Sequence, residues 1–596
     1  MLDGGADRSA VLLGVALVLI LGGGALGWWG NTAGGQVEVR DVQFEGTNGT
    51  AMAGHLYVPQ GASAEDPAPG VLAVHGYINT KQVQAPFATE YARRGYVVLA
   101  MDQTGHGYSE PPAFSNAFGG PDGLAYLHSR AVVDNDSVAI TGHSMGGWAI
   151  TAAAGVHPRK YSASLYQGSA PGPIPGFSAI PDATAPNGSA TYPRNMGVVF
   201  SEYDEFHWLM WGAETAAAAP NSEKMRGQFG TDEPVSTDRV YGDVSAGSAR
   251  KLYTPATTHP GDHISAAAVA DSVDWLGRTV PTDTQLAPSN QLWYLKEIGT
   301  FLALLGAVLF VFPAGKLLLG RDALAGAVAD VGAPVTEKGM GWYGNALLAA
   351  LVPILTYYPA MVIGDNAVPA TPPFTQQITN GVLLWALVNT VVAALLVGIW
   401  HYRRDSGGDA LARYGLDTGD GYGAVTRAAA VALAVVGSLY LLLVVVDAAF
   451  NVDFRIWFIA LKLLAPWHVL PFLAALPVLT AFTVVLGVLL HGRLRTGATT
   501  DSLRRAMATN TLLVAGGFVL LVAVQYVPLF TGNALLLPQL ALYAIVSLSF
   551  VPVLAAVAVI STYFYHRTGR VWTGAFVNAL LLAWFLVAGT ATHAVL

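Results

Sequence analysis

The 596-residue chain has no cysteine, which excludes disulfide bonds, thiolate metal sites and a cysteine nucleophile. It is also poor in charge, since Lys, Arg, Asp and Glu together make up 12% of its residues. The formal net charge is −8 and no block of basic residues occurs, so the composition gives no support for nucleic-acid binding. A domain outside the cell would have to rely on its own hydrophobic core, because no disulfide can stabilise it.

Hydrophobic residues, which make up 53% of the chain, divide it into three parts. Residues 10–29 form an apolar run after Arg8, which predicts an N-terminal transmembrane anchor within residues 1–30, with a signal peptide as the alternative. Residues 36–280 have the mixed composition of a water-soluble domain. Residues 290–596 are mostly apolar runs of membrane-spanning length, which predict a helical transmembrane domain of about eight spans.

The water-soluble part begins with two stretches of alternating polarity, 36–44 and 51–58, which predict a β-hairpin. Short apolar runs follow, and helix-like stretches separate several of them. The predicted strands lie at 71–74, 96–101, 137–140, 162–166 and 196–200. An antiparallel start followed by β-α alternation predicts an α/β fold, a mostly parallel sheet with helices on both faces. In such sheets the chemistry takes place beyond the carboxyl ends of the strands.

Residues 141–147 (TGHSMGG) lie between a short apolar run and a helix-like stretch. Strand, sharp turn and helix are the context of a nucleophile elbow, which would lift the hydroxyl of Ser144 above the sheet. Gly142 and Gly146 leave room where Cβ atoms would collide in this turn. The pattern favours Ser144 as a nucleophile over the alternative of an ordinary glycine-rich turn.

A serine nucleophile needs a base that takes its proton, and the base needs an acid that orients it. Asp204 lies a few residues past the end of a predicted strand, with Glu202 and Glu205 as nearby competitors. Two histidines then compete for the role of base. His259 lies in the loop after a later predicted strand, and His263 lies closer to the start of the following helix. We favour Asp204 as the acid and His259 as the base, and His263 is the alternative base.

An oxyanion hole needs two N–H donors that point at the developing negative charge. The backbone N–H of Met145, directly after the predicted nucleophile, is one candidate. The other should come from the loop after the first parallel strand, where residues 75–77 read HGY, so the N–H of Tyr77 is the second candidate. His75 is expected to have a structural role in this turn.

These residues resemble the α/β-hydrolase superfamily, and specifically its serine aminopeptidase (S33) and monoacylglycerol-lipase-like branch. The resemblance covers about residues 36–278. It is carried by HGY at 75–77, the stretch DQTGHGYS at 102–109, the elbow, and the acid and base loops in this order. It implies hydrolysis through a Ser-His-Asp triad and an acyl-enzyme. It does not identify a substrate, because the same constellation serves esters, thioesters and amides.

The apolar half predicts spans at 292–317, 342–364, 381–400, 428–450, 468–490, 511–530, 536–563 and 571–591. Basic residues fall in alternate loops between these spans, whereas the loops at 365–378 and 531–539 contain no Lys or Arg. Because cytoplasmic loops carry the excess of Lys and Arg, we expect the N-terminus inside the cell and the hydrolase domain and C-terminus outside.

The sequence also makes a structural prediction for two further segments. Residues 453–467, which are apolar but include Arg455 and Lys462, predict an amphipathic helix at the membrane interface. Residues 168–194 are rich in Pro and Gly and form either a linker or a short lid over the site.

The sequence as a whole predicts a membrane-anchored, extracytoplasmic serine hydrolase that cleaves carboxylic esters, lipid-derived ones included. The reaction needs no metal or cofactor, and the expected partners are a small-molecule ester or lipid-like substrate and the membrane. One alternative is a peptidase or amidase that uses the same triad. Another is a transporter-like membrane protein with an accessory hydrolase domain. The oligomeric state stays open.

Overall fold

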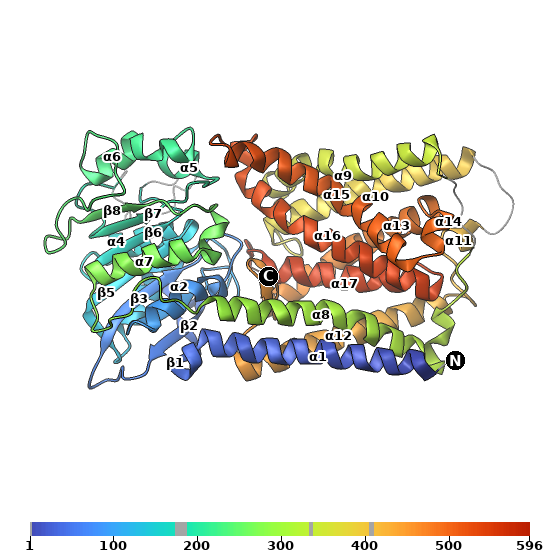
Figure 1. Ribbon diagram of the computed structural model, residues 1–596, viewed down its shortest axis with the longest axis horizontal. Coiled ribbons are helices and arrows are strands. Elements are labelled where there is room, and N and C mark those ends of the chain that lie inside the picture. Colours follow the sequence, from blue (N-terminus) through green and yellow to red (C-terminus); the bar gives the residue numbers. More distant parts are fainter. Residues whose placement is uncertain (1–2, 173–187, 333–337, 404–409, 596) are drawn as a thin grey trace.

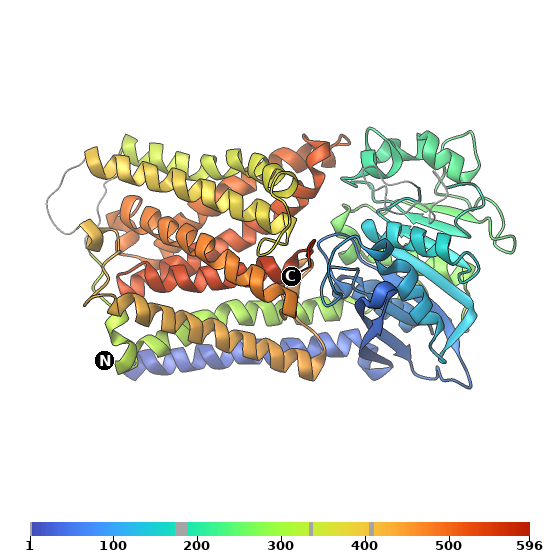
Figure 2. The ribbon, with the colours of Figure 1, turned by 180° about the vertical axis from the view of Figure 1, so that it is seen from behind.

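The computed structural model describes residues 3–172, 188–332, 338–403 and 410–595. The molecule has two parts that lie end to end along its long axis (Figure 1). One is built around a β-sheet and is called the sheet domain here; the other, the helical bundle, consists of long helices that run along that axis. The N-terminus lies at the end of the bundle farthest from the sheet domain, and the C-terminus lies where the two parts meet (Figures 1 and 2).

An eight-stranded sheet forms the centre of the sheet domain, with the strand order β1-β2-β4-β3-β5-β6-β7-β8. Strands β1, β2 and β4 pair antiparallel, and the remaining pairs are parallel. The strands are β1 (Val37–Glu45), β2 (Ala51–Pro59), β3 (Ala68–Val74), β4 (Val97–Met101), β5 (Val133–His143), β6 (Ala163–Gln167), β7 (Met196–Val199) and β8 (Arg250–Tyr253). The predicted hairpin and mostly parallel sheet are confirmed.

Helices cover both faces of this sheet, as predicted. Side chains of a strand alternate between its two faces, so Leu72 and Val74 of β3 pack on one core and Val71 and Ala73 on the other. The first core includes α3 (Gly120–His128) and α4 (Met145–Val156). The second includes α2 (Ala85–Ala92) and α7 (Ala266–Thr279). Two shorter helices, α5 (His207–Trp211) and α6 (Glu223–Phe229), lie in the insertion between β7 and β8.

Nine helices of the described residues are long and apolar enough to cross a membrane, which indicates a multi-pass membrane protein. They include α1 (Asp3–Asn31), which packs closely along α8 (Tyr294–Leu319). A Cβ on Gly23 of α1 would come within 2.6 Å of backbone atoms of α8, a close approach that only small residues allow. The other long helices are α9 (Met340–Asn366), α10 (Gln377–Arg403), α12 (Gly423–Phe450), α13 (Val469–Val488), α15 (Leu503–Phe530), α16 (Ala541–Thr568) and α17 (Trp572–Gly589).

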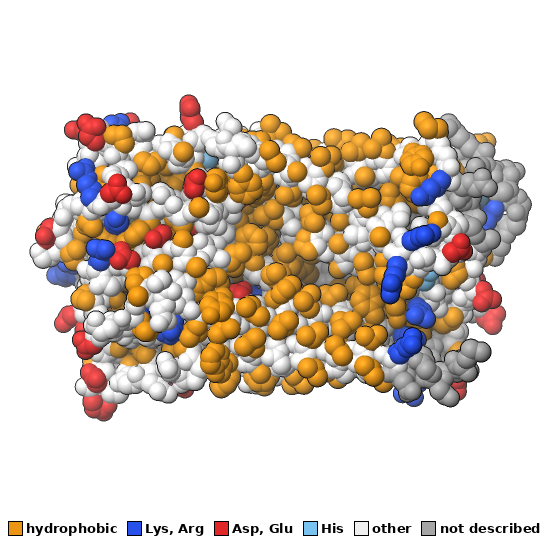
Figure 3. All heavy atoms as spheres, viewed as in Figure 1, with side chains coloured by type: hydrophobic (Ala, Val, Ile, Leu, Met, Phe, Trp, Pro, Cys, Tyr) orange, Lys and Arg blue, Asp and Glu red, His pale blue; other side chains and the backbone are white. Residues whose placement is uncertain are grey.

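Charge is unevenly distributed over the bundle. A broad apolar band surrounds its middle, and Lys and Arg gather at the end away from the sheet domain (Figure 3). At that end Arg495 donates a hydrogen bond to the carbonyl of Gly332, and Arg570 donates to that of Gly326. The loops between α8 and α9, between α13 and α15, and between α16 and α17, which the charge pattern predicts to be cytoplasmic, therefore lie together at this end.

The predicted amphipathic helix at 453–467 is wrong. This segment forms a small hairpin of β9 (Phe454–Ile456) and β10 (Ile459–Leu461). The side chains of Arg455 and Lys462 are buried, and Arg455 forms a bidentate ion pair with Asp453. Because Arg455 is paired with Asp453 inside the protein, its charge does not need a polar helical face toward water. The lid prediction falls largely on residues 173–187, which lie outside the described residues.

Candidate active site

The turn at Ser144 joins β5 directly to α4, as the elbow pattern predicts. Ser144 has φ 54° and ψ −122°, a strained conformation for a residue with a side chain. A Cβ on Gly142 would collide with the carbonyl of Gly146, and a Cβ on Gly146 would collide with that of Val74. Glycine is therefore required at both positions if strand, turn and helix are to pack this closely.

The predicted acid and base lie side by side. Asp204 follows β7, His259 follows β8, and His259 Nδ1 lies 2.8 Å from Asp204 Oδ2. Both side chains are buried. The second carboxylate oxygen of Asp204 accepts the N–H of Phe206 at 2.7 Å, which fixes the orientation of the carboxylate. With Nδ1–H donated to Asp204, the Nε2 of His259 is left as the proton acceptor.

Electrostatics tune this histidine. Burial by itself lowers the pKa of His259, but the charge and hydrogen bond of Asp204 outweigh burial and raise the pKa above its ordinary value. Glu205 and Asp262 act in the same direction. A histidine that is both oriented and made more basic is suited to take a proton from a serine hydroxyl.

Glu205, a competitor for the acid in the sequence, has a different position. Its Oε2 accepts the backbone N–H of His259 at 2.8 Å, and its Oε1 accepts the hydroxyl of Tyr526 at 3.0 Å. Burial, followed by repulsion from Asp204, raises the pKa of Glu205 to about 7. Tyr526 belongs to α15, so this carboxyl group links the helical bundle to the loop that carries His259.

His263, the alternative base, packs against a different ring. Its imidazole lies 4.1 Å from that of His143, between centroids, and contacts Phe87 edge-on. The structure therefore brings His259, and not His263, to the carboxylate of Asp204. Burial lowers the pKa of His263 well below its ordinary value, which keeps the ring neutral.

The loop after β3 runs beside the nucleophile. A Cβ on Gly76 would lie 2.9 Å from Cβ of Ser144, so only glycine lets the backbone pass here. Tyr77 and Met145, the residues predicted to supply the oxyanion hole, line the same cavity as Ser144. His75 lies behind this loop, where its Nε2 accepts the N–H of Gln103 at 3.1 Å.

Asp102 organises the neighbouring loop. Its carboxylate accepts the backbone N–H groups of Lys81 (2.7 Å) and Tyr108 (3.1 Å), and it pairs with the Lys81 ammonium at 3.2 Å. Burial alone would raise the pKa of Asp102, but Lys81, His75 and the backbone donors hold it at about 2. The charge of this buried group thus holds the loop in place, and none of the residues at 102–109 lines the catalytic cavity.

Ser144 and His259 open into one cavity of about 370 Å³, whose walls come from both parts of the molecule. The sheet domain contributes the candidate catalytic groups together with Trp148, Phe206 and Leu209. The helical bundle and its loops contribute Asp365, Asn366, Gln377, Trp457, Phe458, Leu542 and Ile545. Sequence reasoning missed this second set, because no local pattern shows that residues 200 to 400 positions away will face the serine.

Further contacts hold the two parts together around this cavity. The Trp457 indole donates to the carbonyl of Pro260 at 2.6 Å, next to His259. The Tyr77 hydroxyl lies 3.0 Å from Nε2 of His593, in the segment after α17. Among the described residues no group of three or more metal-ligating side chains occurs.

Residues 65–210 match the family model described as serine aminopeptidase, S33. No curated protein matches the chain. Similar solved structures include brefeldin A esterase, a bacterial homologue of human hormone-sensitive lipase (16% identity, 41% of this chain and 77% of that chain, TM-score 0.28). They also include the α/β-hydrolase GrgF from Penicillium sp. sh18 (14% identity, 41% of this chain and 100% of that chain, TM-score 0.28). A complex of DcsB with a substrate analogue matches at 18% identity over 22% of this chain (TM-score 0.19), and the chain spans only 44% of its length.

Proposed function

We propose that the chain is a membrane-anchored serine hydrolase that cleaves carboxylic esters, since its α/β-hydrolase domain is joined to a domain of long apolar helices. The observation that carries the proposal is the pairing of His259 with Asp204 in the cavity that also exposes Ser144. A strained nucleophile, a buried base and an oriented acid around one cavity have no use in a scaffold.

In the proposed reaction, Ser144 Oγ attacks the carbonyl carbon of the ester while His259 Nε2 takes the hydroxyl proton. The N–H groups of Tyr77 and Met145 hold the oxyanion. The alcohol leaves with the proton from His259, and an acyl-enzyme forms. Water then attacks the acyl group as His259 takes its proton, and the acid is released. Asp204 orients the imidazole and stabilises its charged form throughout.

A fluorophosphonate probe tests the nucleophile directly. We expect the full-length protein to be labelled and Ser144→Ala to stay unlabelled. Ser169→Ala is a matched control, because its hydroxyl lies near the elbow and donates to the carbonyl of Ser144 at 2.7 Å. Equal labelling of Ser144→Ala and the unmodified chain would refute the assignment.

An aminopeptidase is the second candidate, because the cavity also contains a carboxylate. Asp365 lines it, and the hydroxyl of Tyr543 donates to its Oδ2 at 2.6 Å. Such a group could receive the ammonium of a peptide N-terminus. If peptides are the substrate, Asp365→Asn should raise KM for an aminoacyl p-nitroanilide at least tenfold and leave p-nitrophenyl butyrate hydrolysis unchanged. For an esterase, we expect turnover of the butyrate ester and none of the anilide.

The proposed orientation places the hydrolase domain outside the cell, with the basic end of the bundle in the cytoplasm. The chain contains no cysteine, so single cysteines can be introduced as unique labels. Ala64 and Asp501 are exposed, in the sheet domain and near the basic end, respectively. A membrane-impermeant maleimide should label Ala64→Cys in intact cells and Asp501→Cys only after lysis. The reverse result would contradict the orientation.

A further inference from the structure

An apolar groove of about 590 Å³ runs along the side of the helical bundle, next to the catalytic cavity. It lies between α8 and α16, with α17 as its floor and the β9–β10 hairpin at one end. Figure 3 shows the apolar band hollowed in this region. Leu305, on its wall, is 45% exposed, so the groove opens sideways toward the bilayer.

The walls of this lateral groove offer almost nothing to a polar ligand. Asn578 is the one lining residue with a carboxamide among those described, and its Nδ2 is already donated to the carbonyl of Val557 at 3.0 Å. Neither Lys, Arg, Asp nor Glu occurs among the described lining residues. An occupant must therefore be a hydrocarbon chain, which matches apolar walls and loses no hydrogen bonds there.

Two elements line both the groove and the catalytic cavity. Trp457, in the turn of the hairpin, lines both spaces and is held by its bond to the carbonyl next to His259. Helix α16 also lines both, since Ile545 faces the catalytic cavity and Pro552 and Ala556 face the groove. These residues are seven and four positions apart, which places them on one face of the helix.

This stripe on α16 has the length that a long acyl chain needs. From Ile545 to Ile560 the helix rises by about 22 Å, which exceeds half of a hydrocarbon core that is about 30 Å thick. A chain lying in the groove would thus remain at bilayer depth, while its carboxyl end reaches the membrane edge beside Ser144.

We infer that the lateral groove binds the acyl chain of a membrane lipid ester and delivers its carbonyl past Trp457 to Ser144. This inference rests on the proposed function and names its substrate class as long-chain lipid esters that enter from the bilayer. Ser144 attacks the ester carbonyl as proposed above, and the released fatty acid returns to the bilayer through the same opening.

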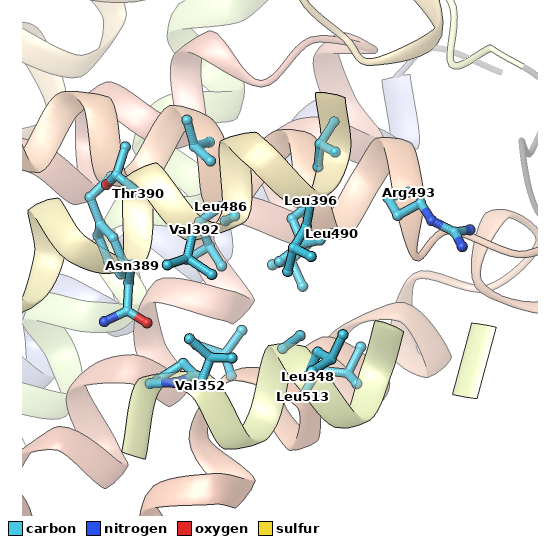
Figure 4. Close-up of a pocket in the computed structure, with 18 of the residues that line it drawn as sticks. Leu348, Val352, Asn389, Thr390, Val392, Leu396, Leu486, Leu490, Arg493 and Leu513 are labelled. Carbon is cyan, nitrogen blue, oxygen red and sulfur yellow. The ribbon is translucent and has the colours of Figure 1, made fainter. Parts of the chain in front are cut away.

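A second cavity of the bundle provides a contrast. It lies between α9, α10, α13 and α15, where Leu348, Leu396 and Leu490 point into it and Arg493 marks one end (Figure 4). None of the described residues that line it also lines the catalytic cavity. Filling this cavity should leave the delivery of a substrate unaffected.

The test uses the full-length protein in phosphatidylcholine vesicles and two esters with one leaving group, p-nitrophenyl palmitate and p-nitrophenyl butyrate. Ala556→Phe fills the lateral groove, Ala393→Phe fills the cavity of Figure 4, and Ala434→Phe adds the same ring on the exposed face of α12. We expect Ala556→Phe to lower kcat/KM for palmitate at least tenfold with butyrate unchanged, and both controls to match the unmodified chain.

A photoreactive fatty-acyl probe gives a readout that does not depend on turnover. In the inactive Ser144→Ala protein it should crosslink to peptides of α8 and α16, and Ala556→Phe should abolish this labelling. Labelling without any effect of Ala556→Phe on palmitate turnover would mean a resident lipid and would overturn the inference. An equal loss of kcat/KM for both esters in Ala556→Phe would overturn it too, and so would the absence of labelling. Ester hydrolysis that persists in Ser144→Ala would instead refute the proposed function.

Discussion

The hydroxyl of Tyr526, on a membrane helix, donates a hydrogen bond to the carboxyl group of Glu205, whose other oxygen accepts the backbone N–H of His259. One buried carboxyl group thus connects α15 to the proposed catalytic base. If this carboxyl group moves, at least one of these two hydrogen bonds breaks. The position of the helical bundle and that of the loop that carries His259 therefore depend on each other.

Removing the hydroxyl of Tyr526 should weaken this connection. We expect Tyr526→Phe to lower kcat for p-nitrophenyl butyrate by about five- to thirtyfold, since a hydrogen bond to a partly charged group contributes about 1–2 kcal/mol. KM should change little, because the ring remains. Tyr563→Phe is the matched control, since its hydroxyl donates to the carbonyl of Phe312, elsewhere in the bundle. An equal loss in both variants would indicate general damage to the bundle.

The charge of Glu205 should appear in the pH profile. Its anion raises the pKa of His259, and the reaction needs this histidine neutral. Removing that charge lowers the pKa of His259, so Glu205→Gln should move the acidic limb of kcat/KM to lower pH. The limb of the unmodified chain should lie above the ordinary histidine value of about 6.5. A limb that stays in place, or moves to higher pH, would contradict this coupling.

Substitutions can show which of His259 and His263 acts as the catalytic base. His259→Gln should lower kcat by a factor of about 1,000 or more, as loss of a triad member does in other serine hydrolases. His263→Gln should retain fluorophosphonate labelling, because the His263 ring packs against His143 and makes no bond to Asp204. If labelling depended on His263 and survived in His259→Gln, the base would have to be reassigned.

Gly168 lies directly against the proposed acid and base. Its φ is +53°, and a Cβ there would lie 2.8 Å from His259 Nδ1 and 3.2 Å from Asp204 Oδ2. Gly168→Ala should therefore reduce kcat by about tenfold or more, through displacement of the pair. Gly212→Ala carries the same backbone strain, with φ +64° and no atom within 4 Å of the new Cβ. It should lower Tm similarly but keep its activity.

Asp102 should stabilise the fold in a pH-dependent way. Its pKa of about 2 lies below the value of about 3.9 for an unfolded chain, so its stabilisation is present above pH 4 and is lost as the pH falls toward 2. Asp102→Asn leaves Lys81 buried without its charge partner and should reduce the free energy of unfolding at pH 7 by about 3 kcal/mol. The difference in Tm from the unmodified chain should be large at pH 7 and smaller at pH 3. A constant difference would assign the loss to packing.

Local features of the sequence determined much of this protein. The elbow at Ser144 follows from glycines that a sharp turn requires, and the strands and spans follow from the period and length of apolar runs, which act over a few residues. The order of Asp204 and His259 along the chain, at the ends of successive strands, also placed the candidate acid and base within reach of each other.

Only the tertiary structure decided what surrounds the serine. Residues 453–467 have the composition of an interfacial helix, yet burial of the Asp453–Arg455 pair turns them into a hairpin that brings Trp457 to the cavity. Likewise, nothing near Tyr526 in the sequence points to Glu205, 321 positions earlier. Such contacts arise when two hydrophobic parts pack against each other, and packing depends on the shapes of complete surfaces, which local periodicity does not encode.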